Sequence, residues 1–219
     1  MRNNEQGRSM IEMLGVLAIV GVLSVGGIAG YSKAMGKFKT NKLIDQINMI
    51  STNIRTLYAS QPSYQGITNT LAKQVNLIPA EMYTDIDNET ITNAFGGPVH
   101  IQSSLANSDE DANAPKAYIL SVAGVPSTAC VSIVTTDWGS DSDAGLVGMM
   151  AAVGEDDTAV VAELDGYTLD SGEGEGEGGD DGAAEEGVHT PGNNIPYNIV
   201  STNASCGVNT MTAIGWKFM

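Results

Sequence analysis

The sequence predicts an α+β fold, in which one long N-terminal α-helix packs on an antiparallel β-sheet head. Three observations carry this prediction. An apolar run of membrane length stands near the N-terminus, an amphipathic helical pattern continues from it, and the remaining chain alternates short apolar segments with Gly, Pro, Asn and Asp. A chain of 219 residues leaves enough length after the helix for one globular domain.

The apolar run covers residues 13–32 and contains no charged side chain. At the helical rise of about 1.5 Å per residue, a run of this length spans roughly 30 Å, the thickness of the hydrocarbon core of a bilayer. A cleaved secretory signal fits poorly, because the run is too long and no Ala-x-Ala site closes it. Five glycines in the run permit close packing of helices: Gly15, Gly21, Gly26, Gly27 and Gly30.

The helical pattern continues beyond the apolar run. Large aliphatic side chains recur every three or four residues until Pro62 ends the pattern: Leu43, Ile47, Ile50, Ile54 and Leu57. We therefore expect one helix over residues 8–60. Its outer half should bury this stripe against the head, whereas its apolar inner half must be surrounded by lipid or by copies of itself.

The head, residues 61–219, is predicted to be mostly β-structure with some helix. Residues 71–77 form a short helical candidate before Pro79. Residues 126–136 are ambiguous, and we favour a helix because their apolar side chains lie on one helical face. The predicted strands are 98–102, 117–123, 146–153, 158–164, 194–202 and 209–218.

Charge is distributed unevenly along the chain. The formal net charge is −16, and residues 137–186 carry many acidic side chains but no Lys or Arg. So negative a surface disfavours nucleic acid as a partner. The Gly-rich acidic stretch at about 165–190 predicts a flexible, solvated loop. An ordered calcium site there is the alternative, because carboxylates are hard oxygen ligands, although their spacing is not that of an EF-hand.

The residue patterns predict no enzyme, no cofactor and no metal centre. The glycines of residues 174–179 match a dinucleotide-binding spacing, but the glutamates between them would repel a pyrophosphate. The only two histidines, His100 and His189, supply too few ligands for a zinc site. No nucleophile-elbow or zinc-helix motif is present in the sequence.

The only two cysteines are Cys130 and Cys206, and neither belongs to a C-x-x-C or Cys/His pattern. We favour a structural disulfide between them, which also indicates an exported, oxidising location. Two buried thiols are the alternative.

One charged residue, Glu12, stands at the upstream edge of the apolar run. Two simple interpretations are that it marks a membrane interface, or that it pairs with Arg8 one helical turn before it. A third interpretation comes from the residues that precede it. There a short polar leader, Met1–Gly7, ends in glycine directly before Arg8, so that Glu12 is the fifth residue after the leader.

This arrangement resembles the N-terminus of type IV pilins, in which a polar leader ending in Gly precedes a long apolar helix with Glu at its fifth position. The resemblance implies that a prepilin peptidase cuts between Gly7 and Arg8 and methylates the new amine. Residues 1–7 would then be a leader, and 8–60 the mature helix. It also implies that Glu12 pairs with the terminal amine of a neighbouring subunit, because an unpaired charge in a dry bundle costs several kcal/mol.

Three head segments narrow the resemblance. They look like parts of the type IVb pilins of thin and enteric pili: Asn93–Val99, Gly124–Cys130 and Ala204–Trp216. In that family the cysteine pair bounds a variable surface region, which here would lie between Cys130 and Cys206.

The resemblance implies a structural function, that of a major pilin in a type IVb-like pilus. The expected partners are other copies in a helical filament, the prepilin peptidase and the pilus assembly machinery. The precursor would reside in the bacterial inner membrane and then enter an extracellular fibre for adhesion or cell–cell contact. A minor pilin or a type II secretion pseudopilin is the alternative in this class. A membrane-anchored acidic protein that binds calcium or another ligand is the alternative outside it.

Overall fold

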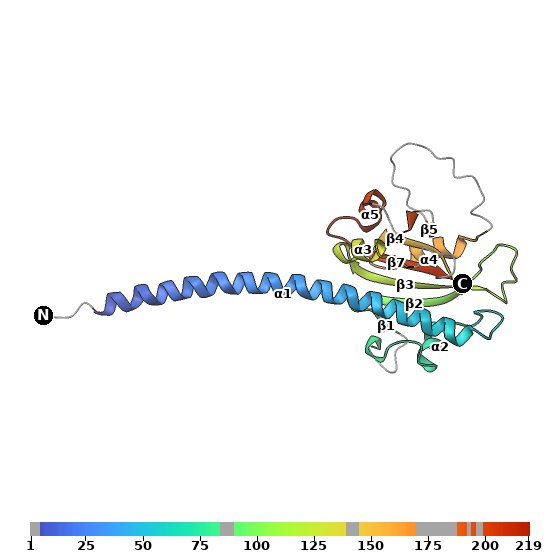
Figure 1. Cartoon of the computed structure of the whole chain (residues 1–219), viewed down its shortest axis with the longest axis horizontal. Coiled ribbons are helices and arrows are strands. Elements are labelled where there is room, and N and C mark those ends of the chain that lie inside the picture. The colour runs from blue at the N-terminus through green and yellow to red at the C-terminus, as the bar shows by residue number, and fades with distance from the viewer. Residues whose placement is uncertain (1–4, 84–89, 139–144, 170–187, 192–193, 196–198) are drawn as a thin grey trace. The chain divides into compact units, whose positions relative to one another are not determined.

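The computed structural model of the chain describes residues 5–83, 90–138, 145–169, 188–191, 194–195 and 199–219 (Figure 1). The chain divides into two compact units, Met1–Lys39 and Thr40–Met219. Helix α1 (Glu5–Tyr58) runs through the boundary between them. The second unit, called the head below, contains the rest of α1 and all the other elements.

Helix α1 confirms the predicted long helix. It begins at Glu5, upstream of the predicted cut after Gly7, and ends at Tyr58. Four side chains of the predicted stripe are at most 1% exposed, namely Leu43, Ile47, Ile50 and Ile54. The fifth, Leu57, is 41% exposed, because the helix ends one residue later. The stripe therefore buries α1 against the head over about three turns.

The head is built on a five-stranded antiparallel sheet in the order β1-β2-β3-β7-β4. The last strand in sequence lies between β3 and β4, so segments far apart in the chain form the centre of the sheet. The strands are β1 (Ile91–Thr92), β2 (Pro98–Ser104), β3 (Ala117–Pro126), β4 (Leu146–Val153) and β7 (Met211–Phe218). Four of them match predicted strands, and the two-residue β1 was not predicted.

The two faces of the sheet bury different clusters. Along β3, Tyr118, Leu120 and Val122 join the larger cluster, which includes the α1 stripe and helix α3 (Ser127–Val134). Ile119 and Ala123 point the other way, into a smaller cluster beneath helix α4 (Thr158–Gly166). This alternation is the period of two expected for a strand that is covered on both faces.

Two helices confirm predictions made from the sequence. Helix α2 (Asn69–Gln74) falls on the predicted short helix, and the Thr68 side chain caps it by accepting a hydrogen bond from the Leu71 amide at 3.3 Å. Helix α3 resolves the ambiguous segment in favour of a helix, with its first turn directly after Pro126. A short 3₁₀ helix, η1 (Ala80–Met82), follows α2.

The predicted strand 158–164 is wrong, because these residues form α4. Their apolar residues fit both periods, since Val160 and Leu164 are four apart and Ala162 lies between them. In the structure Val160 and Leu164 are buried and Ala162 is exposed, which is the helical pattern.

The predicted strand 194–202 is also wrong. Of the described residues in this range, Asn194–Ile195 form β6, which pairs in parallel with β5 (Thr190–Pro191), and residues from 199 on belong to helix α5 (Ile199–Cys206). Pro196 has no amide hydrogen for a sheet ladder, so a strand could not continue through it without losing a hydrogen bond. Most of the predicted acidic loop, residues 170–187, lies outside the described residues.

Candidate functional site

The first part of α1 exposes its apolar side chains on every side of the helix. Each large apolar residue from Met10 to Tyr31 is more than half exposed, and the least exposed of them is Val20 at 52%. Within the described residues, α1 is also the one helix long and apolar enough to cross a membrane, judged by length and composition. A helix that is apolar all round needs lipid or other helices around it.

The polar groups within this stretch are compatible with an apolar environment. The Ser24 hydroxyl donates a hydrogen bond to the Val20 carbonyl at 2.7 Å, so it needs no partner outside the helix. A Cβ built on Gly26 or Gly27 would meet no atom within 4 Å. Backbone at these positions is therefore open to a close helix–helix approach.

The three residues predicted for processing and assembly, Gly7, Arg8 and Glu12, all lie in the helical backbone of α1. The Glu12 side chain is exposed. Cleavage after Gly7 and the pairing of Glu12 with another copy remain predictions.

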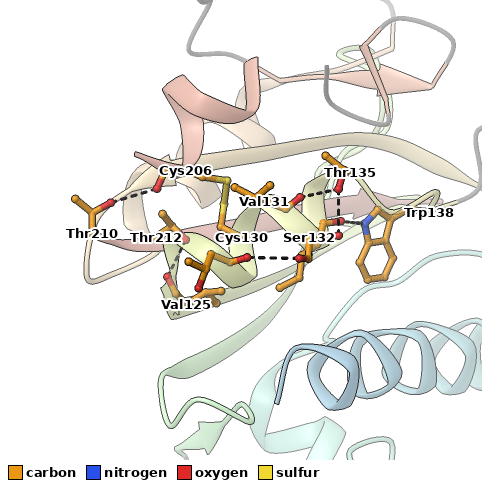
Figure 2. The surroundings of a disulfide bond; sticks show 11 residues. Val125, Cys130, Val131, Ser132, Thr135, Trp138, Cys206, Thr210 and Thr212 are labelled. Atoms are coloured by element: carbon orange, nitrogen blue, oxygen red, sulfur yellow. Dashed lines mark hydrogen bonds between the residues drawn. A yellow bond between two sulfur atoms is a disulfide. The ribbon is translucent and has the colours of Figure 1, made fainter. Parts of the chain in front are cut away.

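Cys130 and Cys206 form a disulfide that joins α3 to α5, with their Cα atoms 5.7 Å apart (Figure 2). Both cysteines are fully buried. The predicted disulfide is thus confirmed, and the alternative of two free thiols is wrong. The bond closes 76 positions of chain and ties the C-terminal segment to the middle of the head.

Hydrogen bonds hold the chain on both sides of the disulfide (Figure 2). The Thr210 hydroxyl donates to the Cys206 carbonyl at 3.2 Å, and the Thr212 hydroxyl donates to the Val125 carbonyl at 2.9 Å. On the far side of α3, the Trp138 indole donates to the Ile133 carbonyl at 2.8 Å. The disulfide therefore lies within an ordered, buried region of the head.

The head segments that prompted the resemblance meet at one place in the structure. The Asn93 side chain donates to the Ala123 carbonyl at 2.8 Å and accepts a hydrogen bond from the Phe95 amide at 2.8 Å. A Cβ on Gly97 would lie 1.9 Å from the Ala123 carbonyl oxygen and 3.0 Å from Gly124 Cα, so only glycine fits at this contact with the second segment. The third segment joins the second through the disulfide and the Thr212–Val125 hydrogen bond. These motifs therefore serve packing and carry no reactive group.

A part-buried polar cluster that the sequence did not predict lies on the other side of the sheet. The Asp157 carboxylate accepts hydrogen bonds on the same oxygen, Oδ2, from His100 Nδ1 at 2.7 Å and from the Ser121 hydroxyl. Ser121 is fully buried and bonds the carboxylate directly, so the histidine does not stand between serine and aspartate as it does in a triad. The residue types match a hydrolase triad, but their arrangement does not.

A buried lysine lies at the opposite end of α4. Lys217 of β7 is fully buried, and its ammonium donates to the Leu164 carbonyl at 2.9 Å and to the Tyr167 carbonyl at 2.6 Å. Burial lowers the pKa of Lys217 to about 8, against the opposing field of Asp165 and Glu110. Across the described part of the chain, no group of three or more His, Cys, Asp or Glu side chains is placed to hold a metal ion.

Comparison with known proteins adds a family to this geometry. The family model described as Bundlin matches residues 33–169, which is more than half of the chain. The chain belongs to the bundlin family. This membership confirms the resemblance to type IV pilins that the sequence suggested.

Two curated relatives support the bundlin assignment. Both are called the major structural subunit of bundle-forming pilus, one from Escherichia coli O127:H6 (strain E2348/69 / EPEC) and one from Escherichia coli O111:H-. Each is 31% identical over 138 residues, which cover 63% of this chain and 68% of the relative.

Two solved structures are also similar to this chain. TcpA, a type IV pilin from Vibrio cholerae El Tor biotype, has a TM-score of 0.49 and 20% identity, over 83% of this chain and 99% of TcpA. A type IVb pilin from Salmonella typhi has a TM-score of 0.44 and 17% identity, over 80% of this chain and 96% of that pilin.

The bundlin match covers some of the residues discussed above and leaves out others. His100, Ser121, Cys130 and Asp157 lie inside the matched range. Glu12, like the predicted processing site, precedes it, and Cys206 and Lys217 follow it. The roles of those outer residues therefore rest on this chain's own sequence and geometry.

Proposed function

We propose that this chain is a structural subunit, a major pilin, of a type IVb-like pilus, and that it polymerises through the N-terminal part of α1. The observation that carries the proposal is the exposure of α1 from Met10 to Tyr31, where every large apolar side chain is more than half exposed to solvent. Burying one such side chain is worth about 1.5–3 kcal/mol. A helix bundle formed by many copies would bury all of them, so the helix can leave the lipid without exposing this apolar surface to water.

The same apolar helix is the proposed membrane anchor of the precursor. Residues 13–32 have the length of a bilayer span, and the window of highest hydropathy in α1 has a mean of 2.2. In this proposal a prepilin peptidase removes residues 1–7 as a leader, so the mature chain begins at Arg8. The assembly machinery then transfers the subunit from the inner membrane into the extracellular fibre, where the heads form its outer surface.

Glu12 is proposed to set the register between neighbouring helices in the fibre. Its carboxylate enters a bundle with little water, where an isolated charge costs several kcal/mol. Pairing with the terminal amine of a neighbouring subunit removes that cost in one register only. Misregistered packing would leave both charges without a partner.

An enzymatic role forms no part of the proposal. The curated relatives are structural subunits by name, and the Ser121, His100 and Asp157 side chains do not form a nucleophile–base pair. The proposal likewise includes no cofactor and no metal.

The test is to produce the full chain in cells that have a type IV pilus assembly system, and to shear fibres from the cell surface. We expect this chain to be the most abundant component of the fibres. Its intact mass should equal that of a chain that begins at Arg8. Retention of residues 1–7, or failure to enter fibres, would contradict the proposal and favour a permanently anchored binding protein. A processed chain at trace abundance in the fibres would instead identify a minor pilin.

A further inference from the structure

Helix α4 lies close against the second face of the sheet. Its buried side chains, Val160 and Leu164, cover Ile119 and Met150. A Cβ on Gly215 of β7 would lie 2.6 Å from Leu164 Cδ1 and 2.7 Å from Val160 Cγ1, so the glycine is what permits this approach. If α4 left its place, this cluster of the core would be exposed to solvent.

Side-chain hydrogen bonds attach the N-terminal end of α4 to the sheet. Asp157 precedes the helix and is 3% exposed, yet its carboxylate does not cap the α4 amides. It instead accepts hydrogen bonds from His100 of β2 and Ser121 of β3. One buried oxygen thus connects α4 to two strands.

The C-terminal end of α4 is held differently. The ammonium of Lys217 bonds the carbonyls of Leu164, in the last turn, and of Tyr167, directly after the helix. Carbonyls at a helix C-terminus lack partners inside the helix, and a cation there also complements the helix dipole. Lys217 is fully buried, so water does not compete for these bonds.

The two ends therefore differ in access to protons. The His100 side chain is 53% exposed and borders an open depression of about 450 Å³, which α4, β2 and Asn69 of α2 line. The other charged groups on this depression are Asp157, directly before α4, and Asp165 in α4, while Glu155 and Asp156 in the preceding turn are exposed. All of these neighbours are acidic, and the one in contact with His100, Asp157, favours a proton on the imidazole.

We propose that α4 is a pH-sensitive cover of the sheet, whose N-terminal end is latched more tightly when His100 takes up a proton. Protonation turns the hydrogen bond between His100 and Asp157 into a part-buried ion pair. Deprotonation leaves the buried Asp157 carboxylate with only neutral donors. The Lys217 end stays in place, so the helix loosens from its N-terminal end.

The pKa values of both partners agree in direction with this geometry. The hydrogen bond to Asp157 raises the pKa of His100 above 6.5, against the effect of burial. Burial alone would raise the pKa of Asp157, but hydrogen bonds from His100 and Ser121 bring it below 3.8. The latch is therefore complete between about pH 3.8 and 6.5, and it weakens as the pH rises through the raised pKa of His100.

Hydrogen exchange of the full chain in detergent micelles tests the latch. After correction for intrinsic exchange rates, amides of residues 158–166 should lose protection by about two- to fivefold between pH 5.5 and 7.5, as expected for a half-exposed ion pair. This pH range lies below the pKa of Lys217, which is about 8. Amides of β3 should keep theirs. His100→Gln retains a neutral donor without the charge, so α4 protection in this variant should not change between the two pH values.

Three results would overturn the proposal. They are α4 protection in the natural chain that is the same at both pH values, a loss of protection that persists in His100→Gln, or an equal loss in β3. An NMR titration of the natural chain provides a check that needs no variant, since it has only two histidines. The His100 imidazole should titrate above 6.5, and a lower midpoint would also refute the latch.

Discussion

The two parts of α1 are both rich in apolar residues, but only one of them is buried by its own chain. From Met10 to Tyr31 the large apolar side chains are exposed on all sides, whereas the stripe from Leu43 to Ile54 is at most 1% exposed. The difference lies in how the apolar residues are arranged. A stripe needs one partner surface, which the head supplies, while a helix that is apolar all round needs partners on every side.

Polar contacts separate the two parts further. In the head part, Gln46 donates to Glu81 at 2.9 Å, the hydroxyls of Ser51 and Tyr118 are 2.9 Å apart, and Asn53 donates to the Leu77 carbonyl at 2.8 Å. Such bonds fix the position of the helix against β3 and against the segment that contains Leu77 and η1. Glu12 belongs to the other unit of the chain, and its side chain is exposed. We therefore expect changes in the first part to alter assembly and changes in the head to alter stability.

The largest effect is expected from Glu12→Ala. This variant should be processed and inserted normally, and its head should melt at an unchanged temperature, but fibre yield should fall to the background level. The physical reason is that a neighbour's amine loses its partner in a dry bundle. Shear yield and thermal unfolding measure the two effects separately.

Asp45→Ala is the matched control for Glu12→Ala, since Asp45 is also an exposed carboxylate on α1 but belongs to the head part. We expect this variant to assemble. Normal fibre yield from Glu12→Ala would show that Glu12 only marks a membrane interface or pairs with Arg8.

The second prediction concerns the disulfide. Cys206→Ser should lower the free energy of unfolding of the head by about 4–5 kcal/mol on the chain-entropy model, because the bond closes 76 positions of chain. Insertion of α1 in the membrane should not change. Denaturant unfolding of the full chain in micelles gives the first quantity, and membrane fractionation gives the second.

A double variant, Cys130→Ser with Cys206→Ser, serves as control and should match the single variant, because each lacks the same bond. A head of unchanged stability in either variant would show that packing and hydrogen bonds alone hold the C-terminal segment.

The third prediction compares the same substitution in the two parts of α1. Ile47→Ala removes a side chain that is 1% exposed and should cost about 3 kcal/mol of head stability. Ile19→Ala removes a side chain that is 64% exposed and should change head stability by less than about 0.5 kcal/mol. A similar loss of stability in both variants would mean that the head also depends on the N-terminal part of α1.

Sequence patterns predicted α1, four strands of the main sheet, α2, α3 and the disulfide, because these features depend on local periodicity or on residue type. The strand predicted at 158–164 failed because its apolar residues fit both periods. That error has a consequence elsewhere. Lys217 alternates with Gly215 and Ala213 along β7, on the face that α4 covers. In the fold predicted from the sequence, which has no α4, Lys217 would lie on a solvent-exposed face, so its burial could not be predicted.

The polar cluster around Asp157 could not be predicted from the sequence, for a related reason. His100, Ser121 and Asp157 come from three elements, and no spacing in the sequence links them. Only the register of β2 on β3 places His100 opposite Ser121. The roles of Gly7, Arg8 and Glu12 depend on other molecules, so they are still predictions.

The smallest effect is expected from the pH dependence of the head through Lys217. Its folded pKa of about 8 lies below its ordinary value of 10.5, so the folded state binds fewer protons between these two values. The free energy of unfolding should therefore rise with pH in this range, by about 1–2 kcal/mol at pH 9.5. Lys217→Met lacks the titrating group and should show no such rise.

Measurements should stop below pH 10, because burial raises the pKa of Tyr118 to about 12 and its titration then opposes the effect. His100 also lowers stability as the pH rises, so both chains are best compared in a His100→Gln background. If the free energy of unfolding rose no more for the natural chain than for Lys217→Met up to pH 9.5, the prediction would be wrong. Water would then reach Lys217, and α4 would not seal this face of the sheet.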